Sequence, residues 1–229
     1  STEIKVIGLR RVIAERMTAA NLEVPHFSYV EEIDITELEA LRQHHNGRAS
    51  GVNAKLTLLP FLSLALIRTL REFPQCNTTY DKERNVLLRH EAVHLGVATQ
   101  TPDGLKVPVV RHAERLAIKD LAAEIRRVAT AAQDNKIAKE YLGGSTITIT
   151  SLGKLGGIDS TPILNMPEVS IIGVNRAVDR PMVVKGHIAI RCMMNLSSFD
   201  YRFVDGYDAA AMIQRMKEIL EHPAIIFIP

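Results

Sequence analysis

One continuous series of segments, residues 187–221, constrains the fold more than any other part of the chain. Residues 187–196, HIAIRCMMNL, have the apolar composition of a buried strand, and residues 207–221 are typical of a helix. Between them lies SSFDYRFVDG, residues 197–206. A polar loop held between two rigid elements commonly presents reactive side chains. Its polar parts are Asp200, Tyr201, Arg202, Asp205 and Gly206.

Size and composition exclude several classes of protein. The chain has 229 residues, of which 46% are hydrophobic and 24% charged, which suits one large or two small globular domains. A net charge of +2 gives no reason to expect a nucleic-acid partner. No run approaches the roughly 20 apolar residues of a membrane span, and no signal peptide is recognised. Cys76 and Cys192 lack framework or metal-ligand spacing, so we expect two buried free thiols in a reducing compartment, and no metal.

Periodicity predicts the elements of the first half of the chain. Helical spacing of apolar residues at 8–23 ends before Pro25, and the segment 55–74 is apolar almost all round, which indicates a buried helix. His26 follows a proline and is expected to be structural. The other predicted elements are a strand at 27–35, a helix from Asp34 or Thr36 to about Gln43, and a loop at 44–54.

The second half alternates strands and helices. STITIT at 145–150 alternates strictly, as a strand does, and 171–174 is expected to be a central strand. Strands at 93–99 and 106–110 around a turn at 101–105 predict a hairpin. Further predictions are a strand at 86–88, an amphipathic helix at 115–133, and the strand and helix at 187–196 and 207–221.

Two segments do not follow these patterns. The glycines around STITIT lack the GxxxxGK[ST] spacing of a phosphate-binding loop. The tail, residues 222–229, carries Ile225, Ile226, Phe227 and Ile228, and burying each stabilises by about 1.5–3 kcal/mol. We therefore expect the tail to be buried, within the subunit or against another one.

Five strings resemble one family over nearly the whole chain. They are GLRRVIAERM, VPHFSYVEEIDITEL, HLGVATQTPDGLKVPVVR, TPILNMPEV and DYRFVDG. They resemble the dihydrolipoamide acyltransferases, which form the cores of 2-oxoacid dehydrogenase complexes. The resemblance implies the fold of coenzyme-A-dependent acyltransferases, an α/β two-layer sandwich like chloramphenicol acetyltransferase, with a mixed, mainly antiparallel sheet and packed helices. It implies a single domain over 1–229, with the lipoyl and subunit-binding domains of such enzymes absent.

The resemblance also assigns roles to residues. The family motif Asp-His-Arg-x-x-Asp-Gly falls on residues 200–206, and its catalytic histidine position is occupied by Tyr201. Asp205 would support the site, and Thr150 would donate a hydrogen bond to the tetrahedral oxyanion. Without the resemblance, Thr150 is an ordinary strand threonine. By position, coenzyme A contacts fall on Arg42, Thr57, Gln100, Ser151 and Gly173.

Tyr201 departs from the family pattern. A phenol has a pKa near 10, so only about one part in a thousand is ionised at pH 7, and it is a poor base. Tyr201 is an introduced substitution, or marks a natural scaffold without catalysis, or is activated by a cation such as Arg202. Arg202 is alternatively the ion-pair partner of Asp200 or Asp205. We expect Asp205 to be buried and hydrogen-bonded in every case.

Two functions follow from the resemblance. The first is acyl transfer between dihydrolipoamide and coenzyme A, most similar to the bacterial branched-chain type, with acetyl or succinyl transfer still open. The second is an inactive cage that organises partners. The implied partners are further copies of the chain, as a trimer that shares its site between subunits and builds a 24-subunit cube through the tail. Decarboxylase and dihydrolipoamide dehydrogenase subunits would bind through the missing domains, in the bacterial cytoplasm or a mitochondrial matrix.

Overall fold

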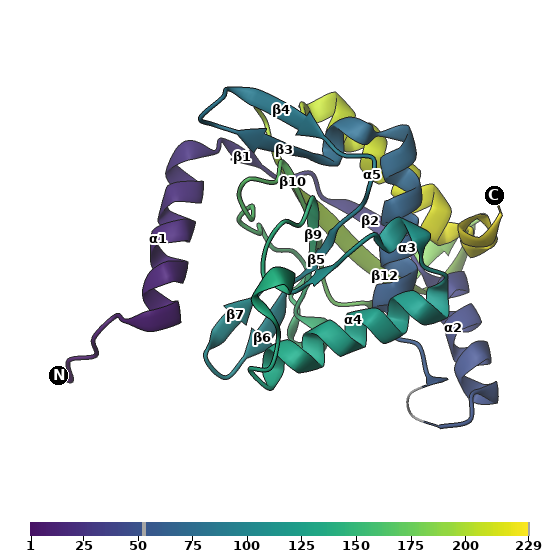
Figure 1. The fold of residues 1–229 in the computed structure, drawn as a ribbon. Helices are drawn as coiled ribbons and strands as arrows, with labels where there is room; N and C mark the ends of the chain where they lie inside the picture. The colour runs from purple at the N-terminus through teal and green to yellow at the C-terminus, as the bar shows by residue number, and fades with distance from the viewer. Residues whose placement is uncertain (52–53, 229) are drawn as a thin grey trace.

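A mixed sheet with helices packed against it forms the body of the protein (Figure 1). The computed structural model describes residues 1–51 and 54–228, without the side chains of 154 and 195–198. In the described chain this sheet has eight strands in the order β1-β12-β10-β9-β5-β8, with β11 and β2 also paired to β12. The strands are β1 (His26–Phe27), β2 (Glu31–Asp34), β5 (Leu95–Val97), β8 (Val109–Val110), β9 (Ile147–Ser151), β10 (Ser170–Val174), β11 (Val178–Val184) and β12 (His187–Asp200).

The centre of the sheet is parallel and its flanks are antiparallel. β9 runs parallel to both β5 and β10, with Gly96 opposite Thr148 and Gly173 opposite Thr150. The pairs that β12 makes with β1, β2, β10 and β11 are antiparallel, as is the pair β5 and β8. The predicted mixed, mainly antiparallel sheet is therefore confirmed.

Three helices cover the sheet and supply much of the core. α3 (Leu58–Glu72) is buried almost all round, as its composition predicts, α4 (Ile118–Gln133) buries the predicted apolar stripe, and α5 (Gly206–Glu221) buries one apolar face. α2 (Thr36–Arg48) packs beside α5 and β12. α1 (Gly8–Glu23) stands at the edge of the molecule in Figure 1 and has Ala20 as its buried residue.

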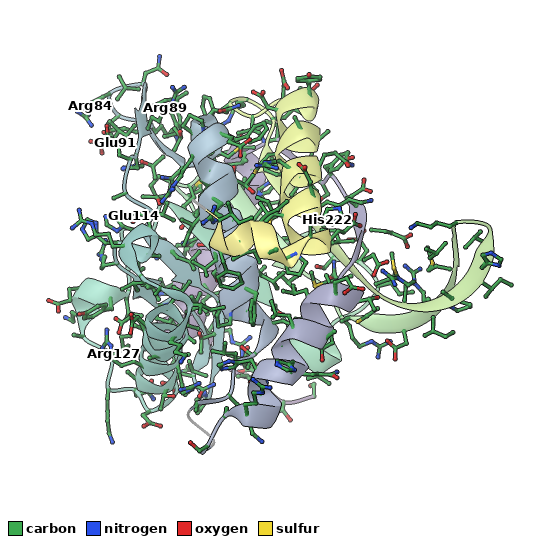
Figure 2. All side chains as sticks on the ribbon, turned by 90° about the vertical axis from the view of Figure 1, so that its right-hand side faces the viewer. Arg84, Arg89, Glu91, Glu114, Arg127 and His222 are labelled. Carbon is green, nitrogen blue, oxygen red and sulfur yellow. The ribbon has the colours of Figure 1, made fainter. Side chains whose placement is uncertain are left out.

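Three hairpins extend from this body. The strands predicted at 93–99 and 106–110 contain β5 and β8, which pair within the main sheet, and the segment between them, predicted as a turn at 101–105, forms a further hairpin of β6 (Thr99–Thr101) and β7 (Gly104–Lys106) in a sheet of its own. β3 (Thr78–Asp81), which the sequence did not reveal, pairs with β4 (Val86–Arg89). β11 was also missed, and with the first half of β12 it makes an arm that projects away from the helices (Figure 2).

Several predicted boundaries are wrong for identifiable reasons. The predicted strand 27–35 is two strands, because β1 pairs with the far end of β12 while β2 pairs with its middle. Pairing with β1 also carries β12 to Asp200, beyond the predicted end at 196. α2 continues to Arg48, so the loop predicted at 44–54 begins later, and its residues 52–53 lie outside the described residues. The helix predicted from 115 begins at Ile118, after a 3-10 turn at Ala113–Arg115.

The thiols and the tail are only partly buried. Burial raises the pKa of Cys76 to about 12, but Cys192 is half-buried, so the prediction of two buried thiols holds for one. The tail forms a 3-10 helix, Pro223–Phe227, in which Ile226 is buried while Phe227 and Ile228 are 50% and 58% exposed. None of the described helices has the length and apolarity needed to cross a bilayer, and the described side chains include no metal-binding group of three or more His, Cys, Asp or Glu.

Candidate functional site

Three of the predicted site residues meet in the centre of the sheet. Thr150 and Ser151 end β9, and the register places Thr150 opposite Gly173 of β10. The Thr150 side chain is half-buried, whereas Ser151 is exposed and its hydroxyl accepts a hydrogen bond from the Gly153 amide at 3.1 Å. The end of β9 therefore presents two hydroxyl groups beside a buried glycine.

Tyr201 follows directly on the last residue of β12. Its amide donates to the Pro25 carbonyl at 3.3 Å, and its ring meets Phe27 edge-on with centroids 5.0 Å apart. The side chain is still 56% exposed. Tyr201 is thus anchored on β1 with much of its ring open to solvent or to another molecule.

Arg202 forms an ion pair with Asp200. Its Nη2 lies 2.8 Å from Oδ2 of Asp200, which is buried, and its guanidinium covers the rings of Tyr80 and Phe203. The hydrogen bond to Asp200 raises the pKa of Arg202. The predicted pair with Asp200 is confirmed. A charge held this way argues against activation of the Tyr201 phenol by Arg202.

Asp205 is hydrogen-bonded as expected but is not buried. It caps α5, and its Oδ1 accepts from the Asp208 amide at 2.9 Å. Its side chain is exposed in the subunit, which corrects the prediction of burial. A carboxylate satisfies a free amide at a helix N-terminus and interacts favourably with the helix dipole while still in water, so capping does not require burial.

His26 lies close to Tyr201 but has no ring nitrogen free for catalysis. Its Nδ1 donates to the Val24 carbonyl at 2.9 Å, and its Nε2 accepts from the Leu164 amide at 3.0 Å. Both bonds join loops to the body of the protein. The structural role predicted for His26 is confirmed, because both ring nitrogens bind backbone groups.

The remaining predicted contacts lie on separate elements. Arg42 of α2 bonds Oε2 of Glu39 at 2.7 Å and the Leu56 carbonyl at 3.1 Å, which places it beside Thr57, the exposed residue preceding α3. The hydrogen bond to Glu39 raises the pKa of Arg42. Gln100 is exposed on β6 and donates to the Thr101 carbonyl at 3.1 Å. Figure 1 shows α2 and the β6–β7 hairpin well separated.

A buried polar cluster around Glu168, which includes Thr148 of β9, was not predicted from the sequence. Oε1 of Glu168 accepts hydrogen bonds from Thr148 Oγ1 at 2.9 Å, from Asn165 Nδ2 at 2.8 Å and from the Ser145 hydroxyl. Glu168 is 2% exposed, and burial raises its pKa to about 7 against the effect of these bonds. The available signal was a glutamate between apolar residues in TPILNMPEV, together with hydroxyls on alternate positions of STITIT.

Comparisons with known proteins place this geometry in a family. The profile of the 2-oxoacid dehydrogenases acyltransferase catalytic domain matches residues 1–228. The lipoamide acyltransferase component of the branched-chain alpha-keto acid dehydrogenase complex of Pseudomonas putida is 58% identical over the whole chain, and 54% of that protein is covered. The chain belongs to the 2-oxoacid dehydrogenase acyltransferase family, as its catalytic domain. It spans about half the length of the curated relatives it matches.

Solved structures agree on the fold. A structure of the dihydrolipoamide acetyltransferase of Azotobacter vinelandii has a TM-score of 0.92 and 36% identity, over 100% of this chain and 94% of that one. It comes from an investigation of the role of a serine, a histidine and an asparagine in the catalytic mechanism of that enzyme. A chloramphenicol acetyltransferase, with a TM-score of 0.60 and 13% identity over 96% of this chain and 99% of that one, shows the shared fold alone.

Proposed function

We propose that the chain is the core of an acyltransferase that moves a branched short acyl group between dihydrolipoamide and coenzyme A. The observation that carries this proposal is the 58% identity to a branched-chain lipoamide acyltransferase over all 229 residues. Thr150 lies near the end of β9, beside Gly173 of β10, whereas Tyr201 follows β12 beside the start of β10. One subunit thus holds the two groups at opposite ends of β10, which fits a site shared between subunits of a trimer. The histidine and asparagine investigated in the Azotobacter enzyme are four positions apart, as are Tyr201 and Asp205.

The reaction assigns a step to each group. A thiol gives up its proton to a base, the role that falls on the side chain at 201, and attacks the thioester carbonyl, so a carbon–sulfur bond forms and the carbonyl oxygen becomes an oxyanion. The Thr150 hydroxyl donates to that oxygen. The old carbon–sulfur bond then breaks, and the leaving thiolate takes up the proton. Asp205 supports residue 201 across the turn between β12 and α5, and the coenzyme is held by Arg42, Thr57, Gln100, Ser151 and Gly173.

The second candidate function is an inactive core that organises partners. Tyr201 favours it, since a phenol with a pKa near 10 is a poor base at neutral pH. The occupied nitrogens of His26 favour it further. Retained binding of coenzyme A does not separate the two functions, because a scaffold can keep its pocket, but turnover does.

Self-association is part of the proposal. Exposed apolar side chains occur at the N-terminus (Ile4, Ile7), on the β11–β12 arm (Val183, Ile188, Ile190) and on the tail (Phe227, Ile228). Exposed apolar side chains that gather on one segment, rather than lying singly, are typical of interaction surfaces. Another solved structure, the cubic core of a pyruvate dehydrogenase complex, matches with a TM-score of 0.92. We propose a trimer that assembles into a 24-subunit cube through the tail.

The rest of the complex is proposed from the relatives. They are bacterial components of dehydrogenase complexes, which suggests a cytoplasmic location. The lipoyl group would arrive on a domain other than the single domain 1–229. Decarboxylase and dihydrolipoamide dehydrogenase subunits would likewise bind through segments beyond it.

Thr150→Val is expected to lower kcat by about 100-fold with little change in KM, because an oxyanion donor acts only in the transition state. Thr150→Ser, which keeps the hydroxyl, should retain most of the activity. The measurement is steady-state acyl transfer from acyl-coenzyme A to dihydrolipoamide in the Tyr201→His protein. Equal rates for the valine and serine variants would remove Thr150 from the mechanism.

Charging the tail is expected to release smaller oligomers. Phe227→Asp together with Ile228→Asp places two carboxylates in a contact that the proposed cube buries, and desolvating them is unfavourable. Sedimentation velocity should show particles of 24 subunits becoming trimers. Leu87→Asp on β4, equally exposed and far from the tail, is the control. A monomer for the unmodified chain at micromolar concentration contradicts the proposed assembly.

A further inference from the structure

Glu168 holds together the beginnings of two central strands. It lies two residues before β10, and its carboxyl is bound by Thr148 of β9 and by Ser145, which precedes β9. Asn165 closes the cluster from the loop before Glu168 and also approaches the hydroxyl oxygens of Ser145 and Thr148. One buried carboxyl therefore joins two strands and a loop on the same face of the sheet.

Only one of the two carboxyl oxygens of Glu168 has hydrogen-bond partners in the described part of the chain. Three donors converge on Oε1, whereas Oε2 is buried and has no hydrogen-bond partner in the described part of the chain. A buried charge without a cation nearby is costly, and a buried carboxyl therefore favours its neutral form. Ionisation of Glu168 strains the cluster, and protonation relieves it.

The cluster adjoins the candidate site along β9. Side chains of a strand alternate between faces, so Thr148 and Thr150 lie on the same face of β9. Thr148 is also confined from the other side by Gly96 of β5, since a Cβ added at Gly96 would lie 2.5 Å from Thr148 Oγ1 and 3.2 Å from Ser145 Cβ. The absence of a side chain at 96 leaves the space that the Thr148 hydroxyl occupies when it binds Glu168.

We propose that Glu168 is a positioning residue for β9. By binding the hydroxyls of Ser145 and Thr148 it holds this strand in place and thereby fixes the position of the Thr150 hydroxyl. When Glu168 loses its proton, this hold loosens. The role of Thr150 in this proposal rests on the proposed acyl transfer. The hold of Glu168 on β9 does not depend on that reaction. Glu168 itself touches neither substrate nor reacting atoms in this scheme.

Other titratable groups surround the cluster. His90 bonds the hydroxyl of Thr79, which bridges Glu168, and burial lowers the pKa of His90. Burial also lowers the pKa of His94, whose carbonyl accepts from the Thr146 amide. Asp81 on β3 forms an ion pair with Arg84, and Arg111 donates a hydrogen bond to the Gly144 carbonyl. Burial raises the pKa of Cys76. β9 and β10 carry no ionisable side chain.

Hydrogen exchange of β9 tests the strand without any need for activity. Between about pH 6 and pH 8, protection of the peptide 145–151, corrected for intrinsic exchange, should fall about tenfold in the unmodified chain, because opening releases a proton. In Glu168→Gln, which keeps the acceptor but does not titrate, protection should be independent of pH. Glu83→Gln, at an exposed position, should behave as the unmodified chain. Equal pH dependence in Glu168→Gln would overturn the proposal.

Kinetics test the coupling to Thr150. In the Tyr201→His background, the ratio of kcat for Glu168→Gln to kcat for Glu168 should rise severalfold between about pH 6 and pH 8, with KM unchanged, since the strand loosens only when residue 168 ionises. The histidine at 201 is present in both proteins and titrates in both, so its effect on kcat cancels in this ratio. A flat ratio with active proteins refutes the coupling and leaves acyl transfer standing. Absence of transfer in both proteins refutes the proposed function, and hydrogen exchange then decides the role of Glu168.

Discussion

Replacing Tyr201 with histidine is expected to raise acyl transfer by about 100- to 10,000-fold, the usual contribution of a positioned general base. An imidazole with a pKa near 6.5 is largely neutral at pH 7 and can accept the thiol proton, whereas a phenol rarely can. The position accepts the change, because the Tyr201 side chain is 56% exposed and contacts Phe27 with its ring edge. The measurement is transfer from an acyl-coenzyme A to dihydrolipoamide.

Tyr201→Phe is the matched control, since it keeps the contact with Phe27 and removes only the hydroxyl. If the histidine variant gains and the phenylalanine variant stays at the level of the unmodified chain, Tyr201 blocks an otherwise intact acyltransferase. Equal activity of tyrosine and histidine proteins would mean that the phenol or another residue is the working base. Inactivity of all three would favour the scaffold function.

Elements whose local pattern matches their burial could be predicted from the sequence. β9 is one, because the isoleucines of STITIT are buried in the core while Thr148 between them binds the polar cluster. α3 and α4 are others, since α3 is apolar almost all round and α4 has a continuous apolar stripe. The site loop was located by its place between an apolar run and a helix, and the family resemblance supplied the roles of its residues.

Features set by distant pairing could not be predicted. β1 and β2 share one run of sequence, and only their two partners along β12 divide it. The edge strand β11 contains Pro181, which weakens the strand pattern in the sequence, and only its seven pairs with β12 define it as a strand. The exposure of Asp205 follows from where α5 begins, and the Glu168 cluster joins positions 145, 148, 165 and 168 through the parallel pairing of β9 and β10. Local sequence does not encode such partners.

The stability of the chain should depend on pH through Glu168. Its pKa is 4.5 in the unfolded chain and about 7 when folded. The folded state therefore binds a proton that the unfolded chain has already released between these values. Stability from this group is fully present below pH 4.5 and is lost as the pH rises to about 7.

The expected loss in the free energy of unfolding is about 3 kcal/mol, at 1.36 kcal/mol for each unit of pKa shift. Glu168→Gln should remove this dependence, because the amide does not titrate, while exposed Glu83→Gln should retain it. The measurement is urea unfolding of the three proteins across this pH range, at one protein concentration, since assembly also contributes to stability. A constant difference between Glu168→Gln and the unmodified chain would contradict the raised pKa of Glu168, because a group with the same pKa in the folded and unfolded chain adds no pH dependence.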